Sequence, residues 1–389
     1  MFSGQLVFAQ LMDFLPRHEF QACVRRYRGD FRARGFSCRD QFLCMAFAQL
    51  TFRESLRDIE TCLRSVQPKL YHAGFRGAIS RSTLGDANRL RDWRIYFDFA
   101  QMLIARARRL YAHEPFGVEL EQTVYALDAT TIDLCLTLFP WAPFRRHKAA
   151  VKLHTLLDLR GNIPTMIRIS SGKMHEIRFL DELVIEPGAF YVMDKGYLDF
   201  GRLFRLQQHA AFFVIRAKRN QAFARRASRP IDKSRGLRSD QTIALTGPLV
   251  SRKYPQPLRR ISSYDPEHRR KLVFLTNNFT LPALTITELY RQRWQIELFF
   301  KWIKQHLRIK TFFGHSENAV KTQVWIAVSM YVLTAILKKE LHSELSLSEM
   351  LQILSVNTFE KTQLITLFLP ETRPSPNSSS HNQRRLFDF

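Results

Sequence analysis

A group of polar and charged side chains between residues 290 and 304 is the part of the sequence best suited to chemistry. If these residues form one α-helix, with about 100° between neighbours, six polar residues fall on or beside a single stripe. They are Tyr290, Arg293, Glu297, Lys301, Lys304 and Arg308. Apolar residues occupy the other sides, so we expect a mostly buried helix. The stripe is either a row of surface ion pairs or a carboxylate that holds a metal among cations that hold phosphates.

Two aspartates in predicted strands complete a set of possible metal ligands. Residues 123–136 are apolar and β-branched and predict a strand through Asp128, and residues 189–194 predict a short buried strand that ends on Asp194. In phosphodiester chemistry two Mg²⁺ ions, for which Mn²⁺ could substitute, activate the attacking oxygen and stabilise the leaving oxygen. We therefore predict Asp128, Asp194 and Glu297 as catalytic residues and metal ligands. Three other acids lie near the predicted sheet and compete for these places: Asp133, Asp158 and Glu176.

The composition indicates a nucleic-acid partner. The chain carries 59 Lys and Arg against 35 Asp and Glu, a net charge of +24, which excludes an ordinary metabolic enzyme. Residues 216–238 contain nine Lys or Arg and one acid, so we expect either a DNA contact that includes Arg225, Arg226 and Arg229 or a solvated loop. A membrane surface would need a basic amphipathic helix or a lipidation signal, and neither is evident. The uncharged run 324–337 is short for a membrane span and predicts a core helix.

The cysteines favour a cytoplasmic protein. There are five, with no Cys-x-x-Cys spacing, so we expect reduced thiols. A zinc site built on Cys38 and Cys44 is the alternative, although its spacing matches no usual finger. The first residues lack the pattern of a signal peptide.

The pattern of apolar residues predicts an α+β protein. Residues 1–118 have helical spacing and are rich in Arg, and residues 80–91 form a capped, polar segment that is either a DNA-recognition helix or a plain surface helix. A predicted hairpin turns at Gly161-Asn162, and a helix, a strand, a helix and a strand follow up to residue 216. This is the order of a ribonuclease-H-like mixed sheet flanked by helices, in which the first and fourth strands are neighbours.

Four segments follow from these patterns. We predict an N-terminal helical DNA-binding domain, a catalytic core in two pieces, a basic β-rich insertion that divides the core, and a C-terminal helix with a disordered tail. Their bounds are 1–118, then 119–217 with 287–340, then 218–286, and finally 341–389.

The motifs resemble those of a known family. The spacing Tyr290-x-x-Arg293-x-x-x-Glu297-x-x-x-x-x-x-Lys304 matches the Tyr-Arg-Glu-Lys signature of bacterial insertion-sequence transposases of the DDE class. The segments 127–134 and 192–197 resemble the first and second Asp motifs of that family, and residues 139–154, with Lys148 and Lys152, are also similar. The resemblance covers about residues 10–340.

The resemblance implies an RNase-H-like (retroviral-integrase-like) core. Asp128, Asp194 and Glu297 would be the metal ligands, and Tyr290, Arg293 and Lys304 would contact DNA at the cleaved end. The enzyme would bind the terminal inverted repeats of its element, cut the ends and join the 3′ ends to target DNA, as a homodimer when two ends are bound. The alternatives are an end-binding repressor without catalysis and another Mg²⁺-dependent DNA endonuclease, although no Glu-x-Lys follows a candidate Asp.

Overall fold

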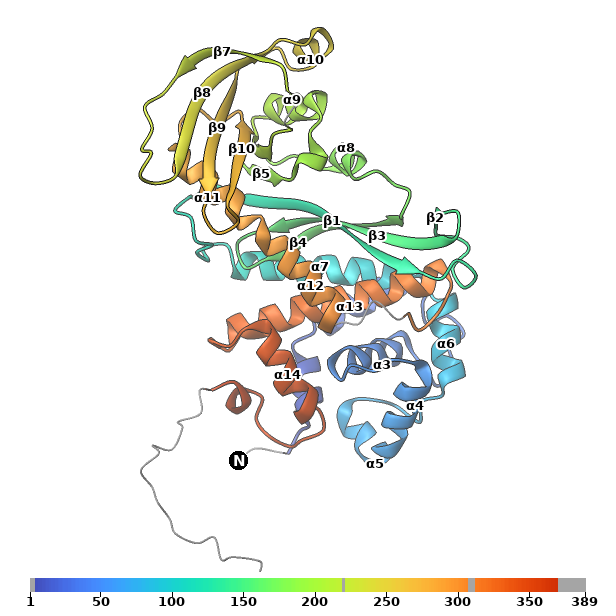
Figure 1. The fold of residues 1–389 in the computed structure, drawn as a ribbon. Helices are drawn as coiled ribbons and strands as arrows, with labels where there is room; N and C mark the ends of the chain where they lie inside the picture. The colour runs from blue at the N-terminus through green and yellow to red at the C-terminus, as the bar shows by residue number, and fades with distance from the viewer. Residues whose placement is uncertain (1–3, 219–220, 307–311, 370–389) are drawn as a thin grey trace, which may run out of the picture.

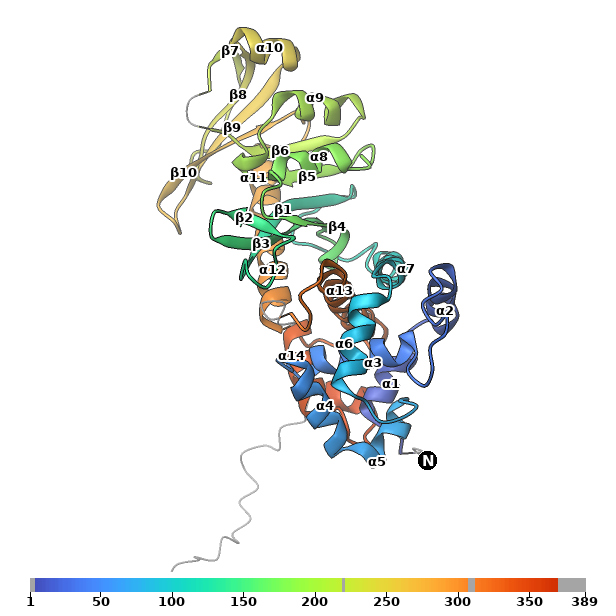
Figure 2. The same cartoon turned by 90° about the vertical axis from the view of Figure 1, so that its right-hand side faces the viewer.

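The computed structural model describes residues 4–218, 221–306 and 312–369. It is a mixed α+β structure in which one ten-stranded sheet is combined with helices from both ends of the chain. A β-rich part lies at one end of the molecule and a helical part at the other (Figures 1 and 2). The predicted α+β class is confirmed.

The described residues before Val124 are helical, as predicted. The longest helix of this N-terminal segment, α7 (Arg94–Leu110), packs along α13 (Glu317–Glu340), and α3 and α6 also contact α13. The remaining helices of this segment are α1 (Val7–Asp13), α2 (Arg17–Arg26), α3 (Cys38–Leu50), α4 (Leu56–Ser65), α5 (Gln67–Leu70), η1 (Tyr71–Ala73) and α6 (Arg81–Leu90). These helices therefore share a core with a helix that follows the sheet in sequence.

Two kinds of strand pairing build the central part of the sheet. The strands β1 (Val124–Leu134), β3 (Lys148–Asp158) and β4 (Ile163–Ser171) are antiparallel neighbours, whereas β5 (Phe190–Met193) and β6 (Phe212–Arg216) run parallel to β1. The short β2 (Pro143–Arg145) pairs with β3. The predicted hairpin turn is confirmed, because Gly161 and Asn162 have φ of +74° and +56°, the left-handed region that such a turn needs.

Helices connect and cover these strands. Between β4 and β5 the chain forms η2 (Glu176–Arg178) and α8 (Phe179–Glu182), where one helix was predicted. After β5 come η3 (Lys195–Tyr197) and α9 (Phe200–Gln208). In Figure 1, α8 and α9 lie on one side of the sheet and α7 and α13 on the other.

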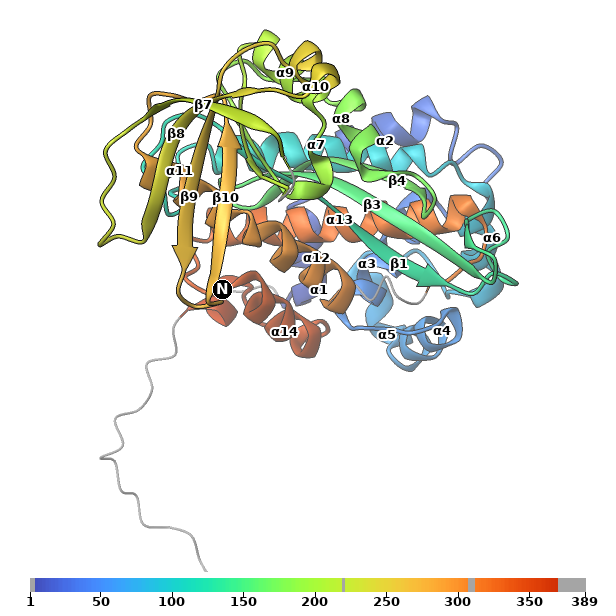
Figure 3. The same ribbon diagram turned by 45° about the horizontal axis from the view of Figure 1, so that its top comes forward.

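The β-rich insertion continues the central sheet. Its strands are β7 (Phe223–Ser228), β8 (Leu237–Leu245), β9 (Leu258–Asp265) and β10 (Arg270–Thr276), with α10 (Pro248–Lys253) between β8 and β9. They lie side by side (Figure 3), and β10 pairs with β6. The strand β7 lies within the basic run 216–238, for which the sequence left both a DNA contact and a solvated loop open.

The predicted helix over residues 290–304 is wrong in two respects. The chain forms α11 (Ala283–Gln292) and α12 (Trp294–His306), which are separated at Arg293, the residue that caps α11. The second error concerns burial, because Trp294 is 56% exposed and Leu298 is 41% exposed. Only part of the surface of α12 is therefore buried.

Alternate residues of the central strands face two hydrophobic cores. Val124 and Ala126 of β1 contribute to the core shared with the N-terminal helices and α13, whereas Tyr125 and Leu127 pack on the side of α8 and α9. This is the two-residue period of a strand that is covered on both faces. The larger core contains residues from 1–118 and from α13 and α14 (Leu347–Asn357).

The helix α13 meets the length and composition of a membrane span, but 94% of its apolar window is buried inside the protein. It is thus the core helix predicted from residues 324–337. The last described element is η4 (Ile365–Phe368). The predicted disordered tail falls on residues 370–389, outside the described residues.

Candidate active site

The strand register brings two aspartates to the same place. Ala126 pairs with Val192 and Leu127 pairs with Met193, so Asp128 and Asp194 are the next residues along two parallel neighbours. Each aspartate follows Ala126 or Val192 by two residues, so its side chain lies on the same face of the sheet, the one that faces the larger core. Asp128 lies within β1, whereas Asp194 lies just past the end of β5.

Arg293 joins the first of these aspartates to Glu297. Its Nη1 donates to Asp128 Oδ2 at 3.1 Å and its Nη2 donates to Glu297 Oε1 at 2.5 Å. The break between α11 and α12 places this guanidinium beside β1, and its side chain is only 14% exposed. Its Nε is buried without a hydrogen-bond partner among the described residues.

Tyr290 connects α11 to the second aspartate. Its hydroxyl donates to Asp194 Oδ1 at 3.1 Å, and its ring packs on Phe274 of β10 at 4.6 Å between centroids. Burial raises the pKa of Tyr290 to about 12, so the phenol remains a hydrogen-bond donor at neutral pH. The Arg293 guanidinium lies 5.7 Å from the centre of the Tyr290 ring, which joins Asp128, Asp194, Tyr290, Arg293 and Glu297 into one network.

The electrostatics of Asp128 are those of a carboxylate that would gain from a cation. Burial raises the pKa of Asp128 to about 6, the Ala129 N–H and Arg293 oppose the rise, and the charges of Glu176 and Glu297 add to it. Carboxylate oxygens are the donors that Mg²⁺ and Mn²⁺ prefer. The donor set of Asp128, Asp194 and Glu297 therefore fits a divalent cation.

Another acidic group lies in the turn between β9 and β10. Asp265, Glu267 and His268 bring possible ligand atoms within 4.8 Å of one another, and within the described ranges it is the one such group of three. His268 Nδ1 is 3.0 Å from Asp265 Oδ2, and both Glu267 and His268 are exposed. An exposed turn of this kind is stabilised by its own ion pair and requires no metal.

The predicted DNA-binding residues of the core have different environments. Lys148 and Lys301 are exposed, and Lys304 is half-buried on α12. Lys152 is only 9% exposed, and its ammonium lies 3.3 Å from Glu176 Oε1. The charge of Lys152 is therefore paired with Glu176 within the protein. Arg308 lies outside the described residues.

The three arginines predicted in the basic run also differ. Arg225 and Arg226 are exposed on β7, which leaves both guanidinium groups at the surface. Arg229 is half-buried, donates to the Phe279 carbonyl at 2.7 Å and lies over the Phe279 ring. Arg229 therefore stabilises the insertion itself.

Two residues near the carboxylates were not singled out by the sequence analysis. Glu176 was only one of three competing acids, although its charge reaches Asp128. Tyr197, in the second Asp motif, is 1% exposed and its hydroxyl has no partner among the described residues. Tyr197 ends the segment that resembles the second Asp motif, whereas no local pattern marks Glu176, whose position depends on how η2 and η3 pack together.

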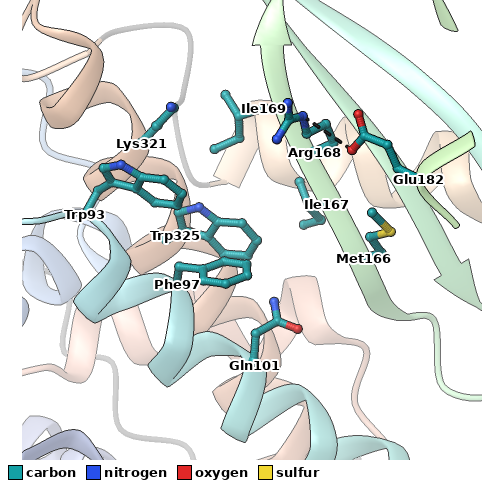
Figure 4. A pocket seen from close by; sticks show the side chains of 10 residues that line it. All are labelled: Trp93, Phe97, Gln101, Met166, Ile167, Arg168, Ile169, Glu182, Lys321 and Trp325. Carbon is teal, nitrogen blue, oxygen red and sulfur yellow. Dashed lines mark ion pairs between the residues drawn. The ribbon is translucent and has the colours of Figure 1, made fainter. Parts of the chain in front are cut away.

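An aromatic pocket of about 230 Å³ lies away from the carboxylates, between α7, β4 and α13 (Figure 4). Trp93, Phe97 and Trp325 form one wall, and the ion pair between Arg168 and Glu182, at 3.5 Å, lies on the opposite side. None of the three predicted catalytic acids lines it. The pocket lies at the boundary between the helical part and the sheet.

Sequence comparisons identify the family of the chain. A family model described as a transposase DDE domain matches residues 119–333, and a second, a domain of unknown function (DUF4372), matches residues 3–76. The first match defines the class of the protein as a DNA-cleaving and transposing enzyme of the DDE type. The chain belongs to the transposase DDE-domain family, as its resemblance to insertion-sequence transposases implied.

Individual proteins show the same similarity. The chain is 29% identical to the putative transposase y4zB of Sinorhizobium fredii over 306 residues, which is 78% of this chain and 83% of that protein. It is 32% identical to a probable transposase for insertion sequence element IS5377 of Geobacillus stearothermophilus over 53% of this chain and 54% of the other.

A solved structure, a piggyBac transposase synaptic complex with hairpin DNA, matches with a TM-score of 0.47 and 11% identity, over 96% of this chain and 83% of that one. A TM-score this low does not establish a shared fold.

Proposed function

We propose that this transposase binds the terminal inverted repeats of its own insertion sequence, cuts the DNA at those ends and joins the freed 3′ ends to target DNA. Asp128, Asp194 and Glu297 are the catalytic residues of this proposal. The observation that carries it is the convergence of three acids from distant parts of the chain on Arg293 and Tyr290.

The strand topology supports an RNase-H-like core. Three antiparallel strands, β1, β3 and β4, are followed by β5 and β6, which run parallel to β1 with α9 between them. The residues that complete the site come from α11 and α12, after the insertion. We propose residues 119–217 and 287–340 as the catalytic core and residues 218–286 as its insertion.

The three carboxylates would hold two Mg²⁺ ions, or Mn²⁺ in their place. When bound, such ions activate the attacking water or 3′ hydroxyl and stabilise charge on the leaving oxygen. Arg293 lies between Asp128 and Glu297 and balances their charge. Tyr290 holds Asp194 by a hydrogen bond and so fixes its orientation.

The same helices supply contacts to the DNA backbone. Arg293, a DNA contact that the family resemblance implies, already donates from both Nη groups to Asp128 and Glu297, and its Nε is buried. We assign further phosphate contacts to Lys301 and Lys304 on α12 and to Lys148 at the start of β3, whereas the charge of Lys152 is paired with Glu176. Phosphate contacts of this kind position the substrate and do not read its sequence.

Recognition of the terminal repeats is assigned to the N-terminal helices. The helix α6 buries Leu84, Ala87 and Asn88 and leaves Arg81 and Arg89 at the surface. A helix held on one side with exposed arginines on the other can enter a major groove. Two ends held together would need two chains, so we propose a homodimer on DNA and a location on the bacterial nucleoid.

The decisive experiment compares binding with cleavage on a labelled terminal-repeat duplex, taken from the DNA that flanks the gene. Asp128→Asn, Asp194→Asn and Glu297→Gln should each retain binding and lose strand cleavage in Mg²⁺ or Mn²⁺ by a factor of a thousand or more, on the order of a lost catalytic group. Asp133→Asn, an exposed carboxylate on the same strand β1, is the control and should cleave normally. Wild-type cleavage by Glu297→Gln would reject the assignment, and cutting of unrelated DNA with equal rate would favour a general endonuclease.

A further inference from the structure

A fourth carboxylate, Glu176, lies close to the three acids assigned above. It belongs to η2, which packs against η3, the turn that follows Asp194. A Cβ atom placed on Gly196 would lie 3.6 Å from Glu176 Oε2. The Glu176 carboxylate therefore reaches the backbone that carries Asp194.

Glu176 also lies within Coulombic range of Asp128. Asp128, Glu176 and Asp194 all lie within such range of the Tyr197 side chain. One phenol thus lies near carboxylates that come from β1, from η2 and from the end of β5.

The Tyr197 hydroxyl is an independent sign that something else is bound here. It is buried, and no hydrogen-bond partner is present for it in the part of the chain that the structure describes. A buried hydroxyl without a partner costs on the order of 1–3 kcal/mol. A hydrated cation between the carboxylates would bring water oxygens within its reach and remove that cost.

Lys152 holds Glu176 in place. Its buried ammonium donates to Glu176 Oε1 at 3.3 Å and to the Met174 carbonyl at 3.2 Å. The ammonium of Lys152 contacts Oε1 of Glu176, whereas Oε2 of Glu176 lies towards Gly196. The β1 strand runs on to Leu134, past its last pair with β5 at Leu127, so the edge of β1 beside Asp128 is not covered by β5.

We propose that Glu176 is a fourth acidic ligand of the divalent-cation centre that Asp128, Asp194 and Glu297 form, and that Lys152 is its positioning residue. The inference rests on the proposed function, because it needs that centre to exist. It is chemically reasonable, since each Mg²⁺ or Mn²⁺ takes one or two carboxylates and completes its shell with water and phosphate oxygens. Without a cation-binding role, the Glu176–Lys152 pair would be structural only.

The test is a titration of the full-length protein, alone and with terminal-repeat duplex, with MnCl₂, in which free Mn²⁺ is followed by electron paramagnetic resonance. Glu176→Gln should bind Mn²⁺ at least about tenfold more weakly, or bind one ion fewer. Asp128→Asn is the positive reference. Glu182→Gln is the matched control, because it removes a carboxylate from the same segment that only pairs with Arg168 at the surface, at 3.5 Å.

A second variant separates binding from folding. Glu176→Gln leaves the buried Lys152 without its partner and could unfold the site, whereas Lys152→Met combined with Glu176→Gln removes both charges. The double variant should keep the wild-type circular dichroism spectrum and show the same loss of Mn²⁺ affinity. Wild-type Mn²⁺ binding by the double variant, with Asp128→Asn impaired, would overturn the inference and leave the proposed function intact. Wild-type binding by Asp128→Asn, Asp194→Asn and Glu297→Gln would instead reject the centre itself.

Discussion

At the scale of single residues, we expect two residues of α12 to have different roles, one in the chemical step and one in positioning the DNA. Glu297 contacts Arg293 beside Asp128, whereas Lys304 lies two turns further along the helix. Lys304→Ala should weaken binding of the terminal-repeat duplex and reduce cleavage by about ten- to a hundredfold, since a lost phosphate contact misplaces the substrate. Saturating DNA should restore part of the rate. Parallel gel-shift and single-turnover cleavage assays measure both effects, and a complete loss of cleavage with normal binding would place Lys304 in the chemical step.

A second residue-scale prediction concerns pH. Burial lowers the pKa of His154 to about 4, helped by the charges of Lys152 and Arg168, and its Nε2 lies 3.0 Å from Ser170 Oγ. The folded protein keeps this imidazole neutral, whereas the unfolded chain takes up a proton below about pH 6.5. Stability is therefore lost as the pH falls from about 6.5 towards 4, by about 2 kcal/mol between pH 7 and pH 5.

The measurement is the free energy of unfolding in urea for wild type and His154→Gln at both pH values. Asp128, whose pKa is raised to about 6, acts in the opposite direction, but it is present in both proteins and cancels in the comparison. The variant should lose less stability than wild type on acidification. Equal losses would show that His154 is protonated in the fold.

The three acids proposed as catalytic could be selected from the sequence because each has a local signal. Asp128 and Asp194 stand in or at the end of apolar β-branched segments, and Glu297 has a fixed spacing from Tyr290 and Arg293. Glu176 has no such signal, since its relation to Asp128 depends on the packing of η2 against η3, and Tyr197 belongs to the second Asp motif but was given no role. The burial of Lys152 could not be predicted either, because a lysine in a strand is usually at the surface.

At the scale of elements, the insertion should depend on one buried ion pair. Arg259 on β9 and Asp240 on β8 are 2% and 4% exposed, with two hydrogen bonds of 2.9 and 2.7 Å between them. Asp240→Asn should cost about 3–5 kcal/mol, because it leaves a buried guanidinium without its counter-charge. Asp181→Asn is the control, since it breaks an equally short but exposed pair with Arg202, and it should cost about 1 kcal/mol or less. Guanidinium unfolding curves give both values, and similar losses for the two variants would contradict the argument.

The sequence patterns failed to predict two local features, the break at Arg293 and the strand β7, for physical reasons. The break at Arg293 interrupts a helical period that continues on both sides, so the period alone cannot locate it. The strand β7 carries exposed arginines and lacks the apolar alternation by which a strand is recognised in a sequence. It forms because its backbone pairs with β8. Strands with a clear apolar alternation or a buried run, such as β1, β5 and β6, were predicted within a few residues.

At the scale of the whole molecule, the helices of residues 1–118 are not independent of the rest. They share one hydrophobic core with α13 and α14, so a fragment that ends at residue 118 would expose the surface that those helices cover. The predicted domain boundary remains a proposal about function. DNA binding by α6 is best tested in the full-length chain, by Arg81→Ala and Arg89→Ala, which leave its buried side unchanged.

The net charge of +24 should make DNA binding by the whole molecule depend strongly on salt. Each phosphate contact adds about 0.9 to the slope of log affinity against log salt concentration. Arg225 and Arg226 are exposed on β7, whereas Arg229 is held by the Phe279 carbonyl and belongs to the fold. Replacing Arg225 and Arg226 by Ala should therefore flatten the slope by about 1–2 units without a loss of stability.

Fluorescence anisotropy with a terminal-repeat duplex at several salt concentrations measures this slope. The matched control replaces Arg17 and Arg64 by Ala, because these exposed arginines already pair with Asp13 and Glu60, each four residues earlier in the chain. That double variant should keep the wild-type slope, although it loses the same formal charge. If both variants flatten the slope equally, net charge alone governs binding. If only the β7 variant does so, the insertion contacts the DNA backbone through Arg225 and Arg226.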